Sequence, residues 1–210
     1  PEVVMVYSDQ GLGKMTRTYH DLYRQHLIRS PYLHKKRPIL INNWEATYFD
    51  FDEKKLLEIA KEASELGIEM LVMDDGWFGK RNLDDSSLEN VKKLGMKFGI
   101  WVEPEMISPE SELYRKHPDW AIQIPGRETT QSRAQYVLDF SRQEVVDGVY
   151  EMIAEVLRSA DISYVKWDMN RQLATMGSSA LPADRQGELY HRYVLGVYRM
   201  QERLIRDFPD

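Results

Sequence analysis

The chain has 210 residues, of which 42% are hydrophobic and 30% charged, as is typical of a soluble globular protein with one sizeable core. A net charge of -6 provides no basic surface for nucleic acid, and no apolar run approaches the ~20 residues of a membrane span. The absence of cysteine excludes disulfides and thiolate metal sites, and the five histidines show no metal-ligand spacing. We expect neither metal nor cofactor. Because no signal peptide opens the chain, which begins at Pro1, we expect a cytoplasmic piece of a longer protein.

The first half of the chain alternates helical and extended patterns. Apolar and aromatic residues recur every three or four positions over 16–29, which predicts an amphipathic helix. A polar connection over 30–38 precedes a short apolar strand at 39–41. A second helix is predicted over 54–66, followed by a strand at 70–73. A short helical piece near 88–94 then leads to a strand at 98–102.

The second half continues the alternation. Residues 136–140 form a short extended run, and Ser141 with Glu144 matches a capping box that would open a helix over 144–158. A strand at 164–167 follows, and the last helix covers roughly 188–207. Continuous apolar strands alternating with amphipathic helices indicate an α/β fold with a parallel sheet covered by helices.

Polar and acidic residues follow four of the predicted strands directly. The four strand ends read NNWE, DDGW, EPE and WDMN. In parallel α/β folds the carboxyl ends of the strands form the site, so these residues should meet in one pocket. One acidic residue after a strand is often only a helix N-cap, but four such ends together favour a site. Tryptophans beside carboxylates and carboxamides suit a sugar, whose hydroxyls need acceptors and whose C–H faces pack on rings.

Two kinds of chemistry fit this cluster of carboxylates. One is glycoside hydrolysis by paired carboxyl groups, and the other is Mg²⁺-assisted proton abstraction. The residues alone leave both open. Lys166 lies two residues before Asp168 on the same strand and therefore on the same side, where a lysine would keep the carboxylate ionised.

Four motifs, in this order, resemble glycoside hydrolase family 36, the bacterial α-galactosidases. They are PILINNWEATYFDF, MLVMDDGWFG, FGIWVEPEMISP and YVKWDMNRQ, and the resemblance covers nearly all of the chain. It implies a (β/α)8 TIM-barrel fold, of which this chain would be about the first half. Residues 1–30 would be the tail of a preceding domain and a linker helix, and residues 31–210 the partial catalytic barrel.

The resemblance also implies roles for single residues. Asp168 would be the nucleophile that attacks the anomeric carbon of the sugar. Asp74 and Asp75 would hold the 4- and 6-hydroxyls of galactose, and Lys166 and Asn170 would bind further hydroxyls. The other residues implied to contact the sugar or line its site are Trp44, Trp101 and Arg133.

The implied function is that of a retaining α-galactosidase acting by double displacement on melibiose- or raffinose-type sugars. The acid/base residue is expected beyond this chain, and the full-length form is expected to be a homo-oligomer. An α-N-acetylgalactosaminidase, a galactosyl transferase and a non-catalytic sugar-binding fragment remain alternatives. The stretch between Gly79 and Leu94 is shorter than in the resembled family, which indicates a deletion or omitted residues.

Overall fold

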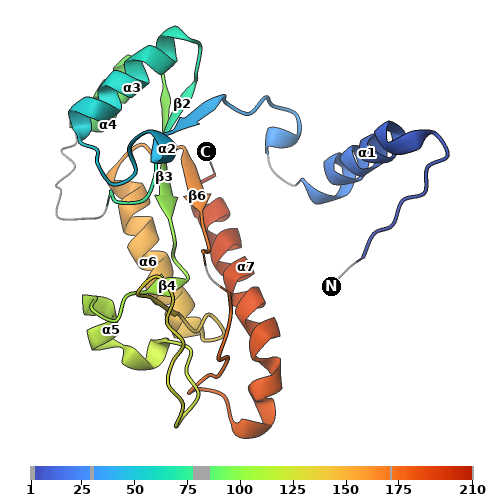
Figure 1. Cartoon of the computed structure of the whole chain (residues 1–210), viewed down its shortest axis with the longest axis vertical. Helices are drawn as coiled ribbons and strands as arrows, with labels where there is room; N and C mark the ends of the chain where they lie inside the picture. Colours follow the sequence, from blue (N-terminus) through green and yellow to red (C-terminus); the bar gives the residue numbers. More distant parts are fainter. Residues whose placement is uncertain (1–2, 29–30, 78–85, 171, 210) are drawn as a thin grey trace. The chain divides into compact units, whose positions relative to one another are not determined.

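The computed structural model describes residues 3–28, 31–77, 86–170 and 172–209, and the chain divides into two compact units at residues 39 and 40 (Figure 1). The first unit contains helix α1 (Gly11–Leu22), a π-helical turn (Tyr23–Leu27) and a 3₁₀ turn (Pro31–Leu33). The helix thus begins five residues before the predicted start at 16. The apolar periodicity marks only the later part, because two glycines obscure residues 11–15. The predicted end at residue 29 lies outside the described residues.

A four-stranded parallel sheet organises the second unit. Its spatial order is β1 (Leu40–Asn42), β2 (Met70–Met73), β3 (Lys97–Val102) and β6 (Tyr164–Trp167). All three neighbouring pairs are parallel, and each strand lies within one residue of its prediction. The sheet and its helices are consistent with half of an α/β barrel, as predicted.

Helices lie between β1 and β2 and between β2 and β3 in the sequence. Helix α2 (Trp44–Thr47) is a single turn, and α3 (Glu53–Glu65) is opened by Asp52, whose carboxylate accepts the Lys55 N–H at 2.8 Å. Gly67 ends this helix with a φ of +83°, a conformation that glycine adopts without strain. Helix α4 (Ser86–Lys93) packs beside α3 and against β3 (Figure 1).

Helix α6 (Gln143–Ser159) forms where predicted, but the predicted capping box does not. The N-cap is Arg142, which makes no side-chain cap hydrogen bond. The hydroxyl of Ser141 instead donates to Asp139 at 2.5 Å, and the Glu144 carboxylate accepts from Arg142 at 2.7 Å. Both side chains of the expected box therefore have other partners.

The predicted extended run at 136–140 does not join the parallel sheet. Its first residues form β5 (Tyr136–Val137), which pairs antiparallel with β4 (Met106–Ile107). Helix α5 (Glu112–Lys116) and a 3₁₀ turn (Pro118–Trp120) lie between these two strands in the sequence. A further 3₁₀ turn (Ala183–Glu188) leads into α7 (Leu189–Asp207), which packs against α6.

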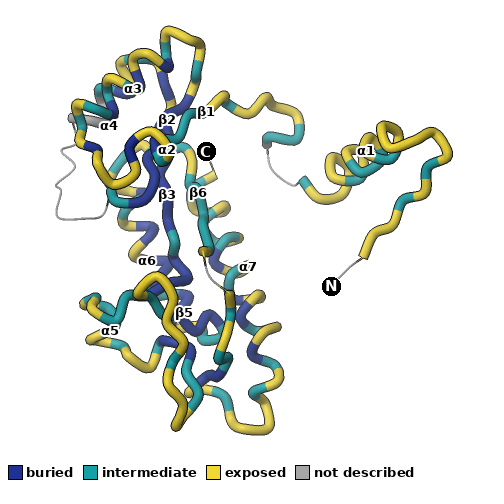
Figure 2. The backbone as a smooth tube through the Cα atoms, in the orientation of Figure 1, coloured by how far each residue is buried: buried dark blue, intermediate teal, exposed yellow. Residues whose placement is uncertain are grey.

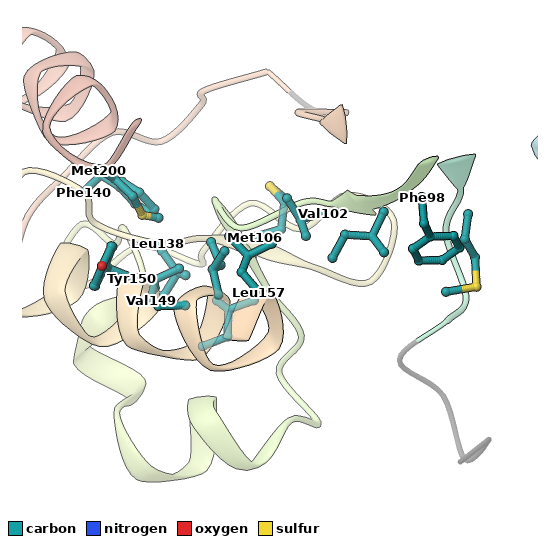
Figure 3. Close-up of a cluster of buried hydrophobic side chains, with 14 of the residues drawn as sticks. Phe98, Val102, Met106, Leu138, Phe140, Val149, Tyr150, Leu157 and Met200 are labelled. Carbon is teal, nitrogen blue, oxygen red and sulfur yellow. The ribbon is translucent and has the colours of Figure 1, made fainter. Parts of the chain in front are cut away.

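The two faces of the sheet differ in chemistry because side chains alternate along each strand. One face contributes to a core shared with the helices, which includes side chains from β3, α6 and α7 (Figure 3). Figure 2 shows most of β3 as buried, and only Lys97 at its start is exposed. The sheet residues of this core are Leu71, Met73, Phe98, Ile100 and Val102. The opposite face carries Trp101 and its register partner Lys166, and it leads to the candidate site.

Candidate active site

The polar residues after the strands meet at one edge of the sheet, as the sequence predicted. Asp74 follows β2, Glu103 follows β3 and Asp168 follows β6, so all three lie at the carboxyl ends of adjacent parallel strands. Trp101 and Lys166 precede these ends on the same face. The parallel register thereby converts four separate sequence motifs into one group of interacting side chains.

Asp74 is a buried carboxylate that accepts three hydrogen bonds, one of them from a lysine. Its Oδ2 accepts from Lys166 Nζ at 2.9 Å and from Asn42 Nδ2 at 2.5 Å, and its Oδ1 accepts the Asp75 N–H at 2.9 Å. Burial opposes its ionisation, but these donors outweigh burial and hold the pKa of Asp74 below its usual value. Asp74 therefore stays ionised and acts as an acceptor.

Asp168 is held by three donors. Its Oδ2 accepts from Trp101 Nε1 at 2.9 Å and from Asn170 Nδ2 at 2.7 Å, and its Oδ1 accepts the Met169 N–H at 3.1 Å. Burial would raise the pKa of Asp168, but the bonds from Trp101 and Asn170 outweigh it and lower the pKa. The result is an oriented, ionised carboxylate, which is the state that a nucleophile requires.

Lys166 has a different main role from the one expected at the sequence level. Its ammonium pairs directly with Asp74. Its attraction lowers the pKa of Asp168 as well, but less than the hydrogen bonds from Trp101 and Asn170 do. The sequence places Lys166 near Asp168 on the same strand, β6. The ion-pair partner of its Nζ is instead Asp74, which follows β2, and β3 lies between these two strands.

Arg133 connects two further carboxylates. Its guanidinium lies 3.7 Å from Asp75 Oδ2 and 3.5 Å from Glu103 Oε1. Burial raises the pKa of Asp75, and the neighbouring Glu103 and Asp74 charges add to this against the attraction of Arg133. The adjacent residues Asp74 and Asp75 thus have pKa values shifted in opposite directions, which gives the two carboxylates different chemistry.

Trp44 lies at the margin of this group. Its indole packs edge-on against Tyr48 and Phe49, with ring centroids 5.2 and 5.0 Å away. Its backbone N–H donates to Asn42 Oδ1 at 2.9 Å, and Asn42 in turn donates to Asp74. Trp44 is therefore linked to the carboxylates through Asn42.

Sequence reasoning missed two residues that contact the predicted site. Asn42 bonds Asp74, and Glu103 accepts the Asn170 N–H at 3.0 Å as well as contacting Arg133. Both stand at strand ends within motifs that the sequence singled out. Their position at the strand ends could have marked them as site residues from the sequence. The residues they contact, however, are set by the register of the neighbouring strands.

No cluster of three or more His, Asp or Glu side chains suited to a metal ion occurs in the part of the chain that the structure describes. Among these same residues, no helix is long and apolar enough to cross a membrane.

The sequence and fold of this chain match those of known proteins. The sequence profile of the Melibiase family matches residues 1–90 and 87–210 of this chain. The chain belongs to the Melibiase family. Among curated relatives in sequence, alpha-galactosidase AgaA of Geobacillus stearothermophilus is 55% identical over 227 positions, which cover 100% of this chain and 31% of the relative.

Solved structures agree with this assignment to the Melibiase family. The crystal structure of the GH36 alpha-galactosidase AgaA has a TM-score of 0.91 and 53% identity, covering 97% of this chain and 31% of that chain. A variant of AgaA in complex with raffinose has a TM-score of 0.90 at 52% identity, with the same coverage. The chain thus spans about a third of the length of these relatives.

The two pieces of the family match meet at residues 87–90. The alignment with AgaA has 227 positions against 210 residues here, so the relative carries at least 17 residues without a counterpart in this chain (227 − 210). We infer that these extra residues belong near the junction of the two matches. The short stretch noted between Gly79 and Leu94 includes this junction, and residues 78–85 lie outside the described residues.

Proposed function

We propose that this chain is the part of a retaining α-galactosidase that carries the nucleophile and most of the galactose-binding residues. The observation that carries the proposal is the bonding of Asp168. A partly buried carboxylate is kept ionised by Trp101 and Asn170 and lies at the end of a barrel strand. Membership of the Melibiase family and the relatives named alpha-galactosidase support the reaction class.

In the proposed mechanism Asp168 attacks the anomeric carbon and forms a covalent galactosyl-enzyme. A second carboxyl group protonates the departing oxygen and then activates the water that hydrolyses the intermediate. We do not assign this second role to any of the 210 residues. Because the relatives are about three times as long, we propose that the acid/base residue belongs to the part of the enzyme outside this chain.

Asp74 and Asp75 would select galactose by accepting hydrogen bonds from its 4- and 6-hydroxyls. An axial 4-hydroxyl that meets a buried acceptor is bound, whereas its epimer leaves that acceptor unpaired at a cost of about 1–3 kcal/mol. Lys166 holds Asp74 for this task, and Lys166 and Asn170 would offer donors to other hydroxyls. Trp44, Trp101 and Arg133 would complete the lining of the pocket.

A relative has been solved in complex with raffinose, which supports α-galactosides of the melibiose or raffinose type as substrates.

The domain organisation belongs to the same proposal. Residues 1–30 would be the tail of a preceding domain with its linker helix, and residues 31–210 the partial catalytic barrel. The separation of the first 39 residues from the rest as a distinct compact unit supports such a division, with a somewhat later boundary. We further propose that the full-length enzyme is a cytoplasmic homo-oligomer.

Covalent trapping tests the proposed function. The chain is incubated with 2-deoxy-2-fluoro-α-galactosyl fluoride, and its peptides are mapped by mass spectrometry. Fluoride departs without help from an acid, so the test needs only the nucleophile and the sugar pocket. We expect a single label on Asp168. A label on another carboxylate would refute the assignment, and an unlabelled chain would favour a non-catalytic sugar-binding fragment.

A further inference from the structure

Glu103 is a nearly buried carboxylate with no role in the mechanism above. It follows β3 directly, and its side chain is only 4% exposed. Its Oε1 accepts the backbone N–H of Asn170 at 3.0 Å and faces the Arg133 guanidinium at 3.5 Å. A carboxyl group this deeply buried needs partners, and the two residues named here belong to the candidate site.

The bond to Asn170 extends the pairing of β3 with β6 beyond the strands. The last main-chain bond between them runs from the Asp168 N–H to the Val102 carbonyl at 2.9 Å. Two residues later, the Asn170 N–H donates to the Glu103 side chain instead. The Asn170 backbone is thereby fixed, and its side-chain amide donates to Asp168 at 2.7 Å. Glu103 thus acts on the nucleophile through one intermediate residue.

The contact with Arg133 holds a second part of the site. Arg133 and Ala134 occupy the centre of a tight turn closed by Ser132 and Gln135, and their φ angles are +52° and +57°. Such angles strain residues other than glycine. The ion pairs with Glu103 and Asp75 hold the guanidinium between the two carboxylates.

We propose that Glu103 is a positioning residue of the site, which holds Asn170 and Arg133 so that Asp168 and Asp75 keep their orientation. Its functional meaning rests on the proposed glycosidase reaction, but its effect on geometry does not. Glu103 itself is not expected to contact the anomeric carbon, because its side chain is only 4% exposed and its Oε1 already contacts two site residues.

The chain provides a matched control in the same motif. Glu105 is also buried, but its oxygens accept from Trp167 Nε1 at 2.8 Å and from the Tyr193 hydroxyl. These bonds tie β6 to α7 on the core side of the sheet. A Glu105→Gln variant therefore perturbs a buried carboxylate two residues away without touching Asn170 or Arg133.

The test compares the 210-residue chain with Glu103→Leu, Glu103→Gln and Glu105→Gln by ¹H–¹⁵N NMR. We expect Glu103→Leu to speed hydrogen exchange of the Asn170 amide about tenfold or more and to shift the indole N–H signal of Trp101, which reports on Asp168. Glu103→Gln keeps an acceptor oxygen and should partly restore both signals. Glu105→Gln should shift the Trp167 indole signal and leave those of Asn170 and Trp101 in place.

An Asn170 amide and a Trp101 indole that are unchanged in Glu103→Leu would overturn the proposal, and so would equal changes in Glu105→Gln. Trapping with 2-deoxy-2-fluoro-α-galactosyl fluoride adds the functional readout. We expect Glu103→Leu to be labelled about tenfold or more slowly than the parent. An unlabelled parent would count against the proposed function alone, because the NMR signals still decide the role of Glu103.

Discussion

Asp168 illustrates how neutral donors keep a partly buried carboxylate ionised. Trp101 and Asn170 both donate to the same oxygen, Oδ2, and Oδ1 accepts the Met169 N–H. The side chain is therefore fixed in rotation but keeps its charge. The indole and the amide stabilise the ionised form by donating hydrogen bonds. Unlike a histidine, neither group titrates near neutral pH.

Replacing Asp168 with Asn in the longer enzyme should lower turnover of an aryl α-galactoside by roughly 10⁴-fold or more, since no nucleophile remains. Raffinose binding should change little, because Asn has the same shape and the other sugar contacts stay. Turnover is measured by release of the aryl group and binding by titration calorimetry. Parent-like turnover would show that another residue attacks the sugar.

The lowered pKa values of Asp74 and Asp168 predict how the stability of the fold depends on pH. Their folded pKa values lie below the unfolded value of about 3.9, so the stability they contribute is complete above about pH 4 and is lost as the pH falls through the folded pKa values. Asp75 acts in the opposite direction, because its pKa is raised. We expect Asp74→Asn to lower the free energy of unfolding at pH 7 by about 2 kcal/mol and to flatten its decline below pH 4.

Urea denaturation at a series of pH values measures this dependence. Asp50→Asn serves as a control, since that carboxylate is exposed and pairs with Lys55 at the surface. An acid decline of the same slope in Asp74→Asn and in the parent would show that Asp74 does not carry the effect.

At the scale of elements, the contact of α7 with the segment after β5 depends on a glycine. A Cβ built on Gly196 would lie 1.8 Å from the carbonyl oxygen of Phe140, which is backbone and cannot rotate away. Gly196→Ala should therefore push the helix outward and destabilise the protein by about 3 kcal/mol or more. Gly187, in the 3₁₀ turn before α7, has open space around it, so Gly187→Ala should be neutral or slightly stabilising.

Thermal unfolding of the two variants checks this contact. Equal melting temperatures for Gly196→Ala and Gly187→Ala would show that α7 does not approach Phe140 this closely. The sequence predicted the helix itself from its apolar spacing. The need for glycine at 196 arises only from packing against a segment more than fifty residues earlier, which no local pattern contains.

Local patterns also failed where side chains had stronger partners nearby. Ser141 and Glu144 have the spacing of a capping box, but their side chains form hydrogen bonds with Asp139 and Arg142 instead. The extended run at 136–140 has the composition of a strand, yet its pairing partner is β4 and not the main sheet. Composition predicts that a segment is extended. The strand with which it pairs depends on the tertiary structure.

At the scale of the whole molecule, apolar surface remains exposed in the second unit. Leu40 and Tyr164 lie on the two outer strands of the described sheet, on the face that carries the site, and both are exposed. Along α7, Tyr190, Val194 and Tyr198 recur every fourth residue and are exposed as well. Open sheet edges and apolar stripes of this kind favour association.

We therefore expect the 210-residue chain to self-associate, with a weight-average mass that rises with concentration in sedimentation velocity. Replacing Tyr190 and Tyr198 with Ser should reduce this association, because it removes apolar surface from α7 without altering the buried face. A single monomeric species at every concentration would contradict the expectation.

The sequence by itself determined the strands, most helices, the membership of four motifs in one site and the resemblance to a family. These features depend on side-chain type and on spacing within short segments. Only the tertiary structure decided which charges meet. Lys166 pairs with Asp74, which is 92 residues away in the sequence. The Glu103 carboxylate accepts the N–H of Asn170, which is 67 residues away. Both contacts form because the parallel register places these strand ends side by side. The geometry of the site is a property of the sheet, which no single motif contains.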